Sequence, residues 1–155
     1  MSRCGFFAGS FDPPTYGHLD LIVRALQVVD RLVVGVGINA DKEPWLPVEE
    51  RVDLLRQTVP ETVEVVAFDG LAVAAARNVN ATLLVRGVRS ETDLASESVM
   101  ARVNEQLDPE LHTVILLASP KVSSISSRLV REIHRAGGPV DRFVPPEVVE
   151  RLTGK

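Results

Sequence analysis

Residues 4–18 read CGFFAGSFDPPTYGH and combine a short apolar run, a loop rich in turn residues and the beginning of a helix. The apolar run ends at Gly9, which lets the chain turn sharply and leaves room for a ligand close to the backbone. Pro13 and Pro14 stiffen the loop, because proline fixes its own φ and restricts the residue before it. Gly17 and His18 then open a segment of helical period. This strand–loop–helix order predicts the first unit of an alternating α/β fold.

The rest of the chain repeats the same alternation of apolar runs and amphipathic segments. The run over 31–38 is nearly all apolar, as expected of a strand that is covered on both faces. Further strands are predicted at 63–68, 81–85 and 113–117, and helices from about residue 17 and over 48–55, 71–78, 92–107, 127–135 and 146–152. This pattern predicts a single domain over residues 1–155, an α/β fold with a doubly wound, Rossmann-like sheet of five parallel strands.

Composition narrows the class of protein. The chain has 155 residues, of which 45% are hydrophobic and 25% charged, typical of one globular domain. A net charge of −4 disfavours an extended nucleic-acid-binding face, which usually needs a basic surface. The sequence has neither a signal-peptide pattern nor an apolar run of about 18 residues, the length that suggests a membrane span. One cysteine, Cys4, excludes an internal disulfide and a cysteine metal cluster. We therefore expect a cytoplasmic protein with neither nucleic acid nor membrane as a partner.

The loop from Gly9 to His18 is the strongest candidate for a ligand site. In doubly wound sheets, ligands bind outside the carboxyl ends of the strands. The helix that follows would present free backbone N–H groups and its positive dipole end to a phosphate. His18 could donate a hydrogen bond to oxygens that gain charge in a transition state. A glycine–histidine pair alone is more typical of an ordinary turn, but ten residues of constrained turn chemistry are far more specific. They indicate a phosphate-binding site.

Three other segments follow predicted strands or precede a predicted helix. Lys42 follows the strand over 31–38, and Arg86 stands at the end of the strand over 81–85, with Gly87 to Arg89 behind it. The serines of 123–127 precede the helix that begins at residue 127. From position alone, these residues could have ordinary roles: a solvated lysine, a surface arginine and serines that cap a helix. They could also bind phosphates, through their cations, hydroxyls and free N–H groups.

Gly9–Pro13 with Gly17–His18 resembles the (T/S)xGH signature of the nucleotidyltransferase superfamily. From about Gly5 to Pro145 the chain resembles the bacterial phosphopantetheine adenylyltransferase family. The resemblance implies transfer of AMP from ATP to 4′-phosphopantetheine, giving dephospho-coenzyme A and pyrophosphate in coenzyme A biosynthesis. The acceptor phosphate attacks the α-phosphorus directly, so positioning and charge stabilisation replace a nucleophilic side chain. It also implies Mg²⁺ held mostly by ATP and water rather than by a protein metal site, and a hexamer.

The resemblance assigns roles to individual residues. His18, Lys42 and Arg86 are the implied catalytic residues, with His18 stabilising the transition state. The implied substrate-binding residues are Ser10, Lys42, Ala72 and Arg86. The implied ATP-binding residues are Ser10, Phe11, His18, Gly87, Val88, Arg89, Glu97, Val122, Ser123, Ser124, Ile125, Ser126, Ser127 and Arg128.

The chain departs from the family pattern at three places. The family commonly has Asp-Phe-Glu-Tyr-Glu where this chain has Asp93-Leu94-Ala95-Ser96-Glu97. It often has an aromatic-Ser-Phe stretch where this chain has Val122-Ser123-Ser124, and a third serine where Arg128 stands. The lost aromatics leave the subunit contacts and feedback inhibition by coenzyme A open.

Three other functions stay open. A nicotinate or nicotinamide mononucleotide adenylyltransferase would suit Ile125–Ser127 with Arg131, but usually has a histidine where Thr15 stands. A cytidylyltransferase fits Gly-His but fits Arg86–Arg89 less well. A nucleotide-binding regulator that has lost catalysis is the third.

Overall fold

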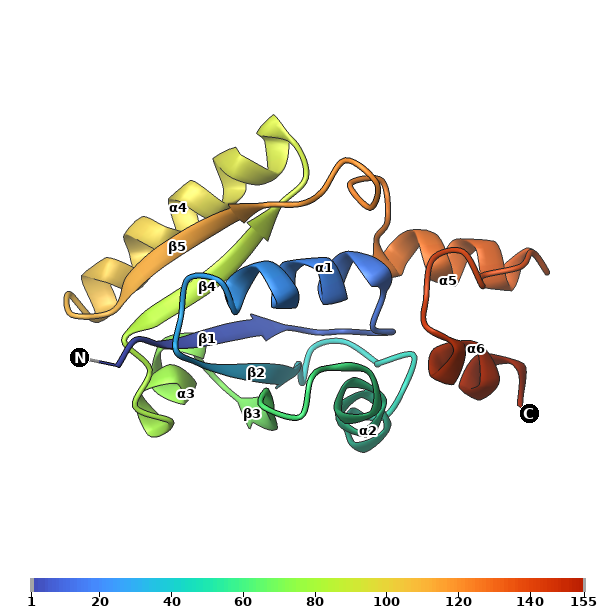
Figure 1. Cartoon of the computed structure of the whole chain (residues 1–155), viewed down its shortest axis with the longest axis horizontal. Coiled ribbons are helices and arrows are strands. Elements are labelled where there is room, and N and C mark those ends of the chain that lie inside the picture. Colours follow the sequence, from blue (N-terminus) through green and yellow to red (C-terminus); the bar gives the residue numbers. More distant parts are fainter. Residues whose placement is uncertain (1, 155) are drawn as a thin grey trace.

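The computed structural model describes residues 2–154, which form one twisted parallel sheet with helices packed on both faces (Figure 1). The strand order is β3-β2-β1-β4-β5, and β1 pairs in parallel with both β2 and β4. The chain therefore winds outward from β1 to one edge, returns, and winds to the other edge. The strands are β1 Cys4–Gly9, β2 Arg31–Ile38, β3 Glu64–Asp69, β4 Leu83–Val88 and β5 His112–Leu117. This arrangement confirms the predicted doubly wound α/β fold.

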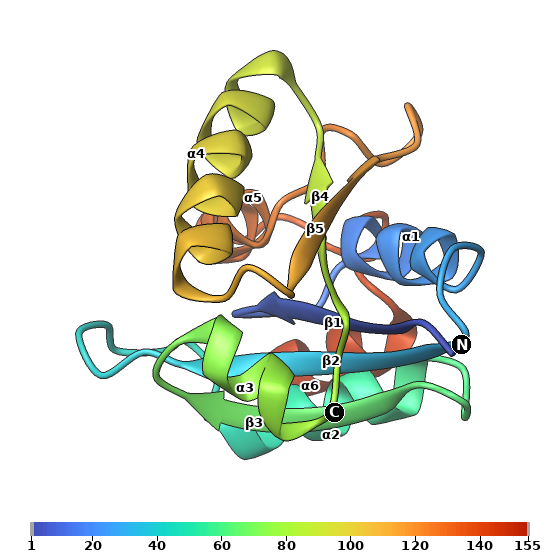
Figure 2. The ribbon, with the colours of Figure 1, turned by 90° about the vertical axis from the view of Figure 1, so that its left-hand side faces the viewer.

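The helices divide between the two faces. α1 and α2 pack on one face, and α3 packs on the other. Figure 2 shows α4 and α1 on opposite sides of β4 and β5. α6 packs against α2 near the C-terminus. The helices are α1 Tyr16–Ala25, α2 Val48–Thr58, α3 Ala72–Asn78, α4 Glu91–Leu107, α5 Ser127–Arg135 and α6 Pro146–Thr153.

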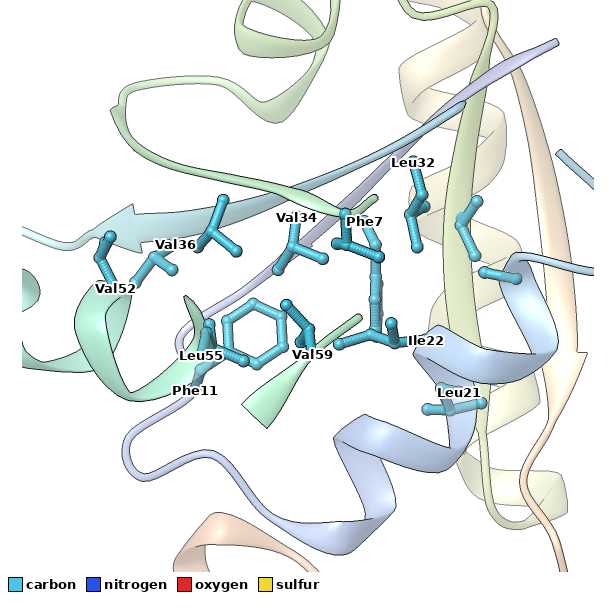
Figure 3. Close-up of a cluster of buried hydrophobic side chains, with 14 of the residues drawn as sticks. Phe7, Phe11, Leu21, Ile22, Leu32, Val34, Val36, Val52, Leu55 and Val59 are labelled. Atoms are coloured by element: carbon cyan, nitrogen blue, oxygen red, sulfur yellow. The ribbon is translucent and has the colours of Figure 1, made fainter. Parts of the chain in front are cut away.

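Side chains of β1 point alternately to the two faces of the sheet and so contribute to the hydrophobic cluster on each face. Phe6 points to the α3 face and Phe7 to the α1–α2 face, as successive residues of a strand must. Phe6 lies so close to β2 that a Cβ at Gly35 would come within 2.2 Å of its ring, so that position must be glycine. Figure 3 shows Phe7 beside Phe11 and Ile22 in the cluster beneath α1.

Phe11 fixes the loop after β1 to this core. Its backbone has φ +50°, in the left-handed region that a bulky residue rarely adopts. Such a conformation costs about 1–3 kcal/mol, while burying a phenylalanine ring contributes about 1.5–3 kcal/mol. The ring is fully buried and also makes an edge-to-face contact with Phe7 at 5.6 Å between centroids. Burial thus offsets the backbone strain and holds the loop in one shape.

The predicted end of β4 was wrong. The strand begins at Leu83 and continues to Val88, so Arg86 and Gly87 lie within it rather than after it. The apolar run stops at the charge, but the ladder with β5 continues through both residues. Gly87 permits this because a Cβ there would lie 2.2 Å from Leu21 of α1. The other elements differ from their predicted bounds only at their ends.

No helix in residues 2–154 is both long and apolar enough to cross a membrane.

Candidate active site

A cavity lies at the carboxyl ends of β1 and β4, where the direction of winding reverses. The N-termini of α1 and α5 and the segment after β5 complete its wall. Several residues predicted to bind ATP or to act in catalysis line it together: Phe11, His18, Arg86, Gly87, Arg89, Val122, Ile125, Ser126 and Ser127. The rule that ligands bind at the switch point of such sheets therefore finds the same place as the sequence motifs.

Two helix N-termini face this cavity. Thr15 caps α1, where its hydroxyl accepts from the backbone N–H of His18. Ser126 caps α5, where its hydroxyl accepts from the backbone N–H of Leu129 at 3.1 Å. Each cap satisfies one of the free N–H groups at the first turn and leaves others for a ligand. Together with the helix dipoles, these groups make the cavity suitable for phosphate oxygens.

His18 is held as a neutral ring at the edge of the cavity. The backbone N–H of Thr15 donates to Nδ1 of His18 at 3.0 Å, and the ring packs edge-to-face on Phe11 at 4.8 Å between centroids. Burial, together with the positive charge of Arg89, lowers the pKa of His18 to about 4. The ring proton at neutral pH is therefore on Nε2, which can donate a hydrogen bond to a ligand.

Arg86 is fixed by Glu97 of α4. The Nε and Nη2 atoms of Arg86 donate to the two carboxylate oxygens of Glu97 at 2.8 and 2.7 Å, and Nη1 donates to the Ala8 carbonyl at 2.6 Å. A guanidinium has five N–H groups, so two remain for a ligand in the cavity. Glu97, which was predicted to contact the nucleotide, accepts a hydrogen bond from Arg86 at each of its carboxylate oxygens.

A second cavity lies next to the first, on the other side of the loop after β1. Gly9 and Phe11 line the first cavity, whereas Ser10 and Asp12 line the second. Lys42 also lines the second cavity, together with Arg51, Arg131 and Arg135. The loop is thus the wall between a cavity with His18 and Arg86 and one with Ser10 and Lys42.

Two serines near the start of α5 make structural hydrogen bonds. Ser127 Oγ donates to the Pro13 carbonyl at 2.7 Å, which ties α5 to the loop after β1. Ser123 Oγ donates to the Pro120 carbonyl at 3.2 Å. Any contact that these two make to phosphates would therefore rest mainly on backbone N–H groups.

Some predicted site residues lie elsewhere. Arg128 is exposed and donates to Glu132 one turn along α5. Ala72 begins α3, on the face of the sheet opposite α1 and α2. Neither cavity is lined by Ala72, Val88, Glu97, Ser123, Ser124 or Arg128.

Two residues that sequence reasoning missed organise the loops. Arg51 is buried, and Asp12 accepts hydrogen bonds from the backbone N–H groups of Trp45 and Leu46 at 2.7 and 2.8 Å. The signal for Arg51 was its place on the apolar face of α2, one turn from Val48 and Leu55. A charge at a core position of an amphipathic helix needs a partner, and here the partners are backbone carbonyls.

Comparison with known proteins gives the family. Residues 6–133 match the cytidylyltransferase-like family. Proteins named phosphopantetheine adenylyltransferase from Caulobacter vibrioides and Bradyrhizobium diazoefficiens are 46% and 44% identical to this chain. The alignments cover 99% and 100% of this chain and 97% and 98% of those proteins. A relative of the same name from Caldanaerobacter subterraneus is 43% identical over 99% of this chain.

Solved structures agree on the fold. A putative nicotinate-nucleotide adenylyltransferase from Vibrio parahaemolyticus superposes with a TM-score of 0.67 at 18% identity, covering 99% of each chain. At that identity the likeness shows the fold alone. The relatives of 43% identity or more, aligned over nearly their full length, show the family. The chain belongs to the phosphopantetheine adenylyltransferases, within the cytidylyltransferase-like nucleotidyltransferases.

Proposed function

We propose that the protein transfers AMP from ATP to 4′-phosphopantetheine and so forms dephospho-coenzyme A and pyrophosphate. Family membership supports the acceptor, since the relatives named phosphopantetheine adenylyltransferase align over almost the whole chain. The observation that carries the chemistry is the neutral His18 beside two helix N-termini. These donors suit a phosphorus centre that gains charge on its oxygens.

The reaction needs one displacement. An oxygen of the acceptor phosphate forms a bond to the α-phosphorus of ATP. The bond from that phosphorus to the bridging oxygen breaks, and its electron pair leaves with pyrophosphate. His18 Nε2–H would donate to an α-phosphate oxygen, where its interaction grows as charge develops. Arg89, in the wall of the same cavity, would add positive charge nearby.

Cations on either side of the loop would position the two substrates. We assign Arg86, in the first cavity, and Ser10 and Lys42, in the second, to the phosphates of the two reactants. Such alignment of two bound reactants accounts for a large part of phosphoryl-type catalysis. Mg²⁺ would enter with ATP, held mostly by phosphate oxygens and water, and would neutralise charge on the departing pyrophosphate.

We further propose that the protein works as a homo-oligomer, a hexamer by its resemblance to the family. α4 supports self-association, because none of its residues is buried within the single chain. Val99, Met100, Val103 and Leu107 lie on it at helical spacing, all at least 43% exposed. A contiguous apolar face of this kind is typical of an interface.

Acceptor choice is tested by supplying Mg²⁺, ATP and either 4′-phosphopantetheine or nicotinate mononucleotide and following pyrophosphate release. We expect release only with phosphopantetheine. The variant His18→Ala is assayed in the same way. His112→Ala is its matched control, since His112 is an exposed histidine on β5 that lines neither cavity. Release with the mononucleotide instead would make the protein a nicotinate mononucleotide adenylyltransferase. No release with either acceptor would favour a regulator that only binds nucleotides.

A further inference from the structure

Arg51 is a buried cation that the proposed chemistry does not use. Its side chain comes from α2, and the residue is only 3% exposed. Among residues 2–154 no carboxylate oxygen lies within 4 Å of its guanidinium. Burying a cation without a carboxylate is unfavourable unless its N–H groups are satisfied. Its hydrogen-bond partners therefore show what the residue is for.

Those partners are carbonyl groups from three separate segments. Arg51 Nη1 donates to the carbonyl of Ser10, in the loop after β1, at 2.6 Å, and to that of Gly37, near the end of β2, at 3.1 Å. Its Nε donates to the carbonyl of Leu46, just before α2, at 3.0 Å. One planar group thus joins the loop that carries Ser10 to both ends of the segment that carries Lys42.

Asp12 joins the same two segments, the loop after β1 and the segment before α2, through its carboxylate. Its two carboxylate oxygens accept the N–H groups of Trp45 and Leu46, so Leu46 is gripped at its N–H by Asp12 and at its carbonyl by Arg51. The backbone of residues 10–12 and that of residues 45–46 are therefore locked together by two charged side chains. Hydrogen bonds that involve a charged group are stronger than neutral ones.

Helix α2 does not need an arginine at this position. Its neighbours on the buried face, Val52 and Leu55, are apolar, and an apolar residue at position 51 would pack with them. The charge serves the loops rather than the helix.

We infer that Arg51 is a positioning residue, which fixes Ser10 and the Lys42 segment relative to each other and so aligns the groups that hold the transferring phosphates. This inference rests on the proposed function for what Ser10 and Lys42 bind. We call the hydrogen bonds of Arg51 and Asp12 that join residues 10–12 to residues 45–46 the clamp. It is inferred from these hydrogen bonds alone.

The test uses Arg51→Met, which removes the donors, and Arg51→Lys, which keeps the charge but not the planar fork. Arg56→Met is the matched control, an arginine on the same helix with its side chain 59% exposed. Trp45 is the only tryptophan of the chain and lies in the segment that Arg51 and Asp12 hold, so its fluorescence reports on that segment. Activity is measured on the full-length protein, each variant also being combined with Lys42→Ala.

We expect both Arg51 variants, but not Arg56→Met, to change the emission and raise the mobility of Trp45. We expect kcat to fall by about tenfold to a hundredfold, the scale of a small misplacement of reacting groups. In the Lys42→Ala background the same variants should lower kcat much less, because Arg51 acts through the Lys42 segment. Arg51→Lys serves on its own if Arg51→Met does not fold.

Three results would overturn the inference. They are an unchanged Trp45 signal, an equal loss of kcat with and without Lys42, and full activity of Arg51→Lys, which would mean that charge alone suffices. An inactive wild-type protein would instead sink the proposed function, while the Trp45 signal would still decide whether the clamp exists.

Discussion

The backbone N–H of Thr15 donates to Nδ1 of His18 at 3.0 Å, and the same histidine supplies the third residue of α1. This is a capping box in which histidine stands where glutamate or glutamine is usual. An N–H group can only donate, so Nδ1 must be unprotonated, and the ring proton is on Nε2. The hydrogen bond that begins the helix therefore also selects the tautomer that faces the ligand.

Burial and the positive charge of Arg89 predict that His18 stays neutral at pH values well below the usual pKa of histidine. NMR titration of the ring should give a pKa of about 4, compared with the ordinary histidine value of 6.5. The resonance can be assigned with His18→Gln, which keeps a capping-box side chain but cannot titrate. Titration near 6.5 would mean that the ring is solvated and that the Thr15 contact does not fix it.

The same shift predicts how stability depends on pH. The unfolded chain binds a proton at His18 near pH 6.5, whereas the folded chain binds it only near pH 4. The free energy of unfolding should therefore fall as the pH drops between about 6.5 and 4, and His18→Gln should lose this part of the slope. Urea unfolding of both proteins across that window measures it. Parallel curves would contradict the shift.

Replacing His18 should damage the chemical step more than binding. We expect His18→Ala to lower kcat by about 10²–10³-fold, as for loss of one donor to a developing charge, with little change in ATP affinity. Stopped-flow pyrophosphate release and calorimetry with ATP measure the two effects separately. Equal losses in both would make His18 a binding residue.

Arg86 and Glu97 should affect the acceptor rather than ATP. We expect Arg86→Ala to raise KM for 4′-phosphopantetheine strongly, and Glu97→Gln to raise it less, because the arginine remains but loses its bidentate partner. Initial rates at saturating ATP measure both. A lower KM for Glu97→Gln would show that Glu97 competes with the acceptor phosphate.

The exposed face of α4 should hold subunits together. Val103→Glu places a charge on the apolar face and should shift the protein to smaller species by light scattering. Asn104→Glu, next to it on the helix but outside that apolar set, is the control. An unchanged mass for Val103→Glu would place the interface elsewhere.

Sequence and structure agree where local pattern decides the outcome. Apolar runs predicted the strands, and the glycine–histidine loop predicted the start of α1, which lies at a cavity. Tertiary contacts decided the rest. The ion pair of Arg86 and Glu97 joins residues on different elements, and the pKa of His18 depends on burial that no motif encodes. The role of Arg51 could not be predicted from the sequence for the same reason, because its hydrogen-bond partners come from three separate segments.

The most direct test of the central claim identifies the products by mass spectrometry. Purified protein is incubated with Mg²⁺, ATP and 4′-phosphopantetheine, alongside His18→Ala at equal concentration. We predict dephospho-coenzyme A and pyrophosphate in equal amounts, with far less of both from the variant. ADP with inorganic phosphate, or no adenylylated pantetheine at all, would contradict the assignment.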